Sequence, residues 1–236
     1  MLYCAAMRAV RVRRAALVAA AIAIGGSFWA VGTAYSAPGD PKTDFNASDQ
    51  AYARTLVLRQ SDLPRVSWIA KPTDFSQPNP PCIVEHYSES TLTLTGRAGR
   101  TYTQQRGPTL SVIESDAGVF RSASQATADY TTLSKPGLAR CFASSLTDNL
   151  LPGVTASVQK VQQLTFAGLP APAHGFLIAV RYHSSQRGDI VVTAVVVTIR
   201  HGRAATILSF VRTGTPWPRT LENALVSLAA HRMTNR

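Results

Sequence analysis

The stretch that decides the fold is residues 190–197, IVVTAVVV, an almost unbroken run of β-branched side chains. Such side chains favour extended strands, and a run without polar alternation is typical of a strand that is covered on both faces. Similar segments flank it at 176–182 and 204–211. We therefore expect a central strand with one neighbour on each side.

The connections between these segments are short. Residues 184–188 join the first two segments, and His201-Gly202 joins the second two as a tight hairpin in which glycine supplies a positive φ. Residues 156–166 predict one more strand before them. The C-terminal third is therefore expected to be an antiparallel meander.

Upstream of the meander the pattern mixes helices and strands. Ser48 is a candidate N-cap for a helix over about 49–60, and a proline-rich loop is expected over 71–82. Residues 91–95 alternate as a strand, which is expected to pair with 101–105 across the glycines at 96–99. Residues 109–120 predict a further strand.

Two more helical regions follow. Ser122 and Gln125 form a capping box for a helix that Pro136-Gly137 interrupts, and a second piece runs to about Leu146. A last helix follows Pro218, with an apolar stripe predicted at Leu221, Ala224, Leu225 and Leu228. The fold class expected is α+β: a single antiparallel sheet of about five to seven strands, packed with three or four helices and stapled by one disulfide.

The N-terminus has the order of an export segment. Four arginines lie between residues 8 and 14, and a charge-free, mostly small and apolar run follows to residue 37. Residues 34–36 fit a peptidase site, whereas the length of the run also fits an uncleaved membrane anchor, and Met7 is an alternative start. We expect 1–37 to be a signal peptide or anchor, 38–47 a linker, and 48–236 a single extracytoplasmic domain, secreted or anchored to the cell membrane.

The chain is basic, with a formal net charge of +11. Its arginines are scattered along the sequence, and no basic run carries interleaved aromatic side chains, so nucleic-acid binding is not expected. A solvated basic surface is the favoured interpretation. Weak association with an anionic membrane surface is the functional alternative.

The domain has two cysteines, Cys82 and Cys141. In an oxidising compartment an even pair predicts one disulfide, here between a proline-rich loop and a helix. The alternative is a reactive thiol or a metal pair, for which Cys82-x3-His86 is the only local support.

No catalytic motif with a known mechanism is present, and the five histidines are isolated, so we expect no catalytic residue, cofactor or metal. The only close carboxylates are Glu114 and Asp116, which on a strand share one face about 7 Å apart, a plausible acid/base spacing. The favoured interpretation places both in solvent at a strand end. The tripeptide 187–189, Arg-Gly-Asp, is interpreted as turn chemistry.

An ordered set of features carries a resemblance to a family. Asp62-Leu63-Pro64 and Trp68 follow the first helix, and the later members are Cys82 beside prolines, Val119-Phe120, the helix that starts at Ser122, Cys141, the meander and a closing helix. In this order the chain, over about 48–233, resembles secreted actinobacterial and mycobacterial proteins similar to the extracellular sensor domain of the kinase PknH. The resemblance implies a disulfide-stapled, non-catalytic α+β domain that binds a small ligand or envelope component in a cleft between sheet and helices.

Three functions are therefore carried forward. The leading one is a non-catalytic extracytoplasmic ligand-binding or sensor-like domain of the cell envelope, with a largely apolar cleft. The second is an envelope-associated hydrolase that uses Glu114 and Asp116 with a histidine. The third is a structural or adhesion protein of the envelope that acts through its basic surface.

Overall fold

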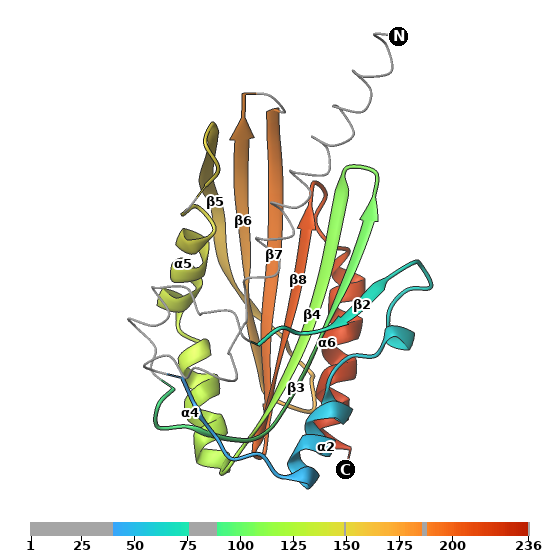
Figure 1. Ribbon diagram of the computed structural model, residues 1–236, viewed down its shortest axis with the longest axis vertical. Coiled ribbons are helices and arrows are strands. Elements are labelled where there is room, and N and C mark those ends of the chain that lie inside the picture. The colour runs from blue at the N-terminus through green and yellow to red at the C-terminus, as the bar shows by residue number, and fades with distance from the viewer. Residues whose placement is uncertain (1–39, 76–88, 149, 186–187, 236) are drawn as a thin grey trace, which may run out of the picture.

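The computed structural model describes residues 40–75, 89–148, 150–185 and 188–235. These residues form an eight-stranded sheet with four α-helices (Figure 1). In chain order the elements are β1 (Lys42–Thr43), α2 (Ala47–Leu56), the short 3-10 helix η1 (Gln60–Asp62), β2 (Ile69–Pro72), β3 (Thr93–Arg106), β4 (Thr109–Phe120), α4 (Ala123–Leu133), α5 (Pro136–Ser145), β5 (Val154–Thr165), β6 (Ala173–Ser184), β7 (Gly188–His201), β8 (Ala204–Thr213) and α6 (Arg219–Thr234). The α+β class and the number of helices agree with the expectation.

The strands lie in the order β1-β3-β4-β8-β7-β6-β5, and β2 pairs with β3 beside β1. Helices α4 and α5 cover one face of the sheet, here called the α5 face (Figure 1). Helices α2 and α6 cover the opposite face, here called the α6 face. Each face therefore has its own apolar core.

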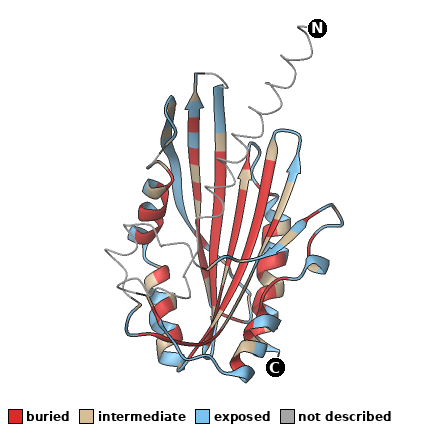
Figure 2. Cartoon of the chain, in the orientation of Figure 1, coloured by how far each residue is buried: buried red, intermediate tan, exposed pale blue. Residues whose placement is uncertain are grey.

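The predicted meander is confirmed. Strands β6, β7 and β8 pair antiparallel in sequence order, and Gly202 adopts φ 54° in the β7–β8 hairpin. Every residue of β7 from Val192 to Ile199 is buried, which is the burial expected of a central strand with helices on both faces (Figure 2).

The hairpin predicted across residues 96–99 is wrong, because β3 runs unbroken through them and turns only at Gly107, where φ is 57°. The glycines serve close approach instead of a turn. A Cβ on Gly96 would collide with the backbone carbonyl of Asp49 in α2, and one on Gly99 would collide with the side chains of Asp116 and Phe75. Sequence alone does not separate these two uses of glycine.

The sheet is larger than expected and is not purely antiparallel. Strand β1 lies in the segment predicted as a linker, and it pairs parallel with β3 through Lys42 and Thr93. Strand β2 is the second addition, at 69–72. Both are short strands at the sheet edge that form by pairing with β3. Their own sequences are too short to show the alternation of apolar and polar residues that predicts a strand.

Two helix details also differ from the expectation. Asn46, instead of Ser48, caps α2, because its Oδ1 accepts from the backbone N–H of Asp49 at 2.9 Å, and α2 ends at Leu56. In α6 the buried face is built by Leu225, Val226, Ala229, Ala230 and Met233, while Ala224 is exposed. The capping by Ser122 is confirmed, since its Oγ accepts from the N–H of Gln125. The other half of the predicted capping box is wrong, because the Gln125 amide bonds the backbone of Thr91 and Thr93 instead of that of Ser122.

Gly96→Ala is expected to lower the free energy of unfolding by about 2–3 kcal/mol, because the added methyl group must displace the backbone of α2. Urea unfolding followed by circular dichroism measures this. Gly137→Ala is the matched control, since nothing lies within 4 Å of a Cβ built there. Equal stability of the two variants would contradict the close packing of α2 on β3.

Candidate functional site

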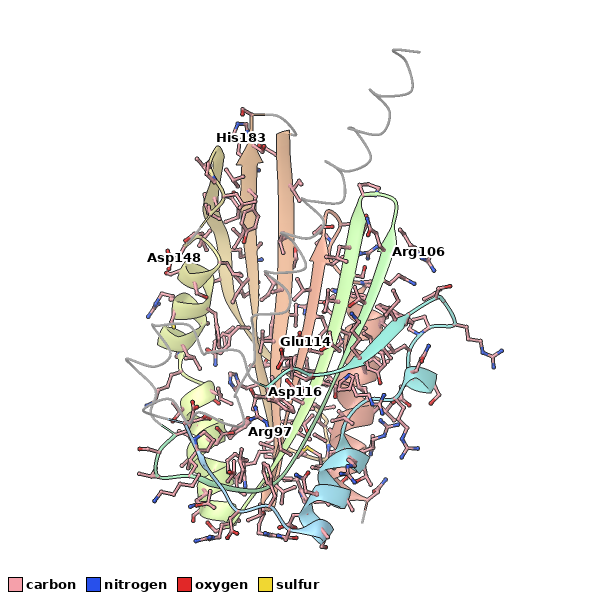
Figure 3. The ribbon with its side chains drawn as sticks, viewed as in Figure 1. Arg97, Arg106, Glu114, Asp116, Asp148 and His183 are labelled. Atoms are coloured by element: carbon pink, nitrogen blue, oxygen red, sulfur yellow. The ribbon has the colours of Figure 1, made fainter. Side chains whose placement is uncertain are left out.

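Glu114 and Asp116, here called the acid pair, lie in the middle of β4 on the α5 face of the sheet (Figure 3). Their side chains share this face because strand residues two apart point the same way. Glu114 is 4% exposed and Asp116 is 9% exposed. The expectation that they face solvent at a strand end is therefore wrong, because β4 is flanked by β3 and β8 and is not at an edge.

Asp116 has two neighbours that stabilise its charged form, a hydrogen-bond donor and a cation. Thr73 Oγ1 donates a hydrogen bond of 2.8 Å to its Oδ1. Arg97 of β3 attracts it electrostatically and also stacks on Phe75, with the guanidinium carbon 3.8 Å from the ring centroid. Burial nevertheless raises the pKa of Asp116 to about 7, against the opposing effects of Thr73 and Arg97.

Glu114 lacks such support. Its Oε2 is buried without a hydrogen-bond partner, and so is the Oγ of Ser209, which lies directly opposite it on β8. Burial, and then the charge of Asp116, raises the pKa of Glu114 to about 8. Near neutral pH the Glu114 carboxyl is therefore mostly protonated and able to donate a hydrogen bond.

Arg97 is the cation of this region. Its guanidinium is attracted by Asp116, Glu89, Asp40 and Asp129, which come from four separate segments. Burial lowers its pKa to about 10, so it remains charged at neutral pH. Acidic side chains of β4, α4 and the segments before β1 and β3 thus favour the charged form of Arg97 on the α5 face.

The structure brings the two carboxyl groups together but does not bring a histidine to them. His174 points to the same face from β6, and its register places it three strands from Asp116, roughly 14 Å away. Its Nε2 lies 3.0 Å from the carbonyl oxygen of Leu133, and burial lowers its pKa. His183 lies at the exposed end of β6, where it pairs with Asp189 (Figure 3).

An open groove lies elsewhere on the α5 face, between α5 and the strands β5 and β6. We call it the α5 groove; its volume is about 440 Å³ and its lining is Pro136, Ala139, Arg140, Ala143, Ser144, Val158, Val161, Gln163 and Phe176. Its walls are mainly apolar, and Val158 and Val161 on β5 are 40% and 36% exposed. Arg140 and Gln163 supply polar groups. The acid pair does not line it.

The remaining predicted residues are placed as follows. Cys141 is buried in α5 and packs with the core of the α5 face, while Cys82 and His86 lie outside the described residues, so the disulfide stays a prediction.

Of the tripeptide 187–189, Arg187 also lies outside the described residues. Gly188 has φ 72°, and a carboxylate oxygen of Asp189 lies 3.6 Å from a guanidinium nitrogen of Arg181. Within the described part of the chain no three His, Cys, Asp or Glu residues gather as a metal site.

Three residues of the acid-pair region escaped sequence reasoning: Thr73, Arg97 and Ser209. Each reaches Glu114 or Asp116 only through strand register or through the chain that crosses after β2. The only signal in the sequence was the Glu-x-Asp spacing itself, which gives the shared face but not the burial.

No protein-family model matches this sequence, and neither does any curated protein. Among the described residues no helix has the length and apolar character needed to cross a bilayer. The predicted export segment, residues 1–37, lies outside them.

Proposed function

We propose that this chain is a non-catalytic, extracytoplasmic ligand-binding or sensor-like domain of the cell envelope, as its resemblance to the PknH-type sensor domains implies. The observation that carries the proposal is the α5 groove, which is an open, mainly apolar hollow between a helix and the sheet. A disulfide between Cys82 and Cys141 would fix α5, and thus one wall of the groove, to the proline-rich segment.

The lining suggests the chemistry of the ligand. Apolar side chains of α5, β5 and β6 offer an acyl or other hydrocarbon chain a surface to bury, and the exposed Arg140 offers a carboxylate or phosphate a partner. The proposed ligand class is therefore an amphiphile with an anionic head, which is a component to be expected near an envelope membrane.

Val161→Trp is expected to fill the groove and to weaken binding of a fluorescent long-chain fatty acid at least tenfold. Gln162→Trp is the matched control. The side chain of Gln162 points to the opposite face of β5, and its replacement by tryptophan adds about the same volume as Val161→Trp does. Arg140→Gln, compared with Lys160→Gln, tests the head-group contact in the same titration. Equal fatty-acid affinity for both tryptophan variants, or no binding to the wild type, would contradict the proposal.

A second candidate function is hydrolysis of envelope material, and the observation that favours it is the acid pair. Its pKa values of about 8 and 7 suit a proton donor and a proton acceptor near neutral pH. Burial of both groups and the distance to His174 weigh against it. Turnover of cell-wall fragments that is lost in Glu114→Gln and kept in Asp148→Asn would establish this function in place of the first.

A further inference from the structure

Six cations that are scattered in the sequence come together along one flank of the fold. They lie on α2, on the chain around η1, and on β2 and β3, and we call them the cationic flank: Arg54, Arg59, Arg65, Lys71, Arg100 and Arg106. All six are exposed. Figure 1 shows these elements along the side of the molecule opposite β5, and Figure 3 labels Arg106 there.

The contacts between the elements explain why the segments that carry these cations lie along one edge of the sheet. Strand β2 pairs with β3 so that Lys71 lies opposite Thr101 and Pro72 lies opposite Arg100. Tyr102 of β3 donates through its hydroxyl to the carbonyl oxygen of Leu58, which follows α2, at 2.7 Å. Gln60 of η1 donates to the carbonyl oxygen of Trp68, just before β2. The segments that carry the cations are thus bonded side by side at the sheet edge, where Lys71 lies on the α5 face and Arg100 and Arg106 lie on the α6 face.

Few acids accompany the cations of the flank: Asp62 is attracted by Arg59 as well as by Arg232, and Asp74 follows two residues after Pro72. Residues 54–72 contain a single acid, Asp62, and β3 contains none. Asp62 is bound by Arg232 of α6 at 2.7 and 2.8 Å through both oxygens. Across the described residues none of the six cations forms a salt bridge, whereas Arg121, Arg181, Arg203, Arg219 and Arg232 each do.

An apolar side chain projects beside Lys71, on the α5 side of the sheet edge. Ile69, at the start of β2, is 63% exposed, the largest exposure among the described large hydrophobic residues. It stands between Arg65 and Lys71 in the sequence, on a strand that is mostly exposed (Figure 2). An exposed aliphatic side chain flanked by unpaired basic groups is the combination that interfacial membrane binding uses.

We propose that the cationic flank docks the domain on a membrane surface that contains anionic phospholipid, with Ile69 entering the headgroup layer. Five of the six cations are arginines, whose guanidinium groups bind phosphate with two hydrogen bonds. The groove between α5 and β5 lies on the opposite flank, so docking leaves it open to a ligand. This inference does not depend on what the groove binds.

The test is hydrogen–deuterium exchange of the full chain mixed with lipid nanodiscs, which reports the contacting segment whether or not residues 1–37 also enter the lipid. Discs that contain phosphatidylglycerol are compared with discs of phosphatidylcholine alone. We expect peptides covering 57–72 to exchange at least fivefold more slowly on the anionic discs, and peptides covering 154–165 to be unchanged. Raised salt is expected to remove the protection.

Matched variants separate the flank from net charge. Arg65→Glu with Lys71→Glu is expected to abolish the protection, and Ile69→Ser to reduce it. Lys135→Glu with Lys160→Glu, which changes the net charge equally on other surfaces, is expected to retain it. Protection that is equal on both kinds of disc, that falls on β5, or that both double variants lose equally would overturn the proposal. A different outcome would assign the flank to a polyanion instead of a membrane. In that case the double variant Arg65→Glu with Lys71→Glu loses the protection from exchange, Ile69→Ser keeps it, and a soluble polyanion protects the wild type as well as the anionic discs do.

Discussion

Glu114→Gln is expected to stabilise the protein by up to about 4 kcal/mol at about pH 8 and by less than about 1 kcal/mol at about pH 5. Burial raises the pKa of Glu114 from 4.5 to about 8 in the folded state. Between these two values the folded protein holds a proton that the unfolded chain has released. Each rise in pH within this window therefore favours the unfolded chain, and the neutral amide removes that cost.

The measurement is urea unfolding of wild type and variants at several pH values. The wild type is expected to lose stability from about pH 5 to about pH 8, and Glu114→Gln to lose less. Asp116→Asn should remove a second part of the loss, in the window from 3.8 to about 7. Asp148→Asn, at an exposed residue, is the control. A wild-type stability that rises with pH over this range would show that the acid pair is ionised and compensated in the folded protein.

Phe210→Ala is expected to cost about 3–5 kcal/mol of unfolding free energy, a large share of the stability of a domain this size. Phe210 on β8 is fully buried and meets Trp217 edge to face, with ring centroids 6.4 Å apart. Trp217 in turn stacks on Trp68 at 6.1 Å. Removing the ring opens a cavity between the sheet and the segment before α6.

Urea unfolding followed by tryptophan fluorescence reports this change directly, because Trp68 and Trp217 belong to the same cluster. Phe210→Leu is expected to cost less than Phe210→Ala, since it keeps most of the buried volume. Val158→Ala, at an exposed strand residue, is expected to stay within about 0.5 kcal/mol of the wild type. A cost for Phe210→Ala as small as that of Val158→Ala would contradict the packing described here.

The elements that could be predicted from sequence are those whose own residues carry the periodicity. The run at 190–197 identified the central strand, Ser122 identified a helix start, and His201-Gly202 identified a hairpin. The elements that were missed or misplaced depend on a partner. Strand β1 forms by hydrogen bonding to β3, and a glycine is needed at position 96 because the backbone of α2 lies too close for a Cβ atom.

The site was predictable only in part, because its burial also depends on partner elements. The spacing of Glu114 and Asp116 correctly gave one shared face, but burial was set by β3 and β8, which flank β4, and by the chain that crosses at Thr73. The cationic flank was invisible as a cluster, because the residues that form it are spread from Arg54 to Arg106. Strand pairing brings them to one side.

We propose above that the domain binds a ligand in the groove beside α5 and does not act as an enzyme at the acid pair. Native mass spectrometry of the protein isolated from its own envelope tests it most directly, with wild type, Val161→Trp and Glu114→Gln compared. We predict a bound amphiphile on the wild type and on Glu114→Gln, and its loss from Val161→Trp. A wild type without any adduct, or an adduct that Glu114→Gln loses and Val161→Trp keeps, would contradict the account.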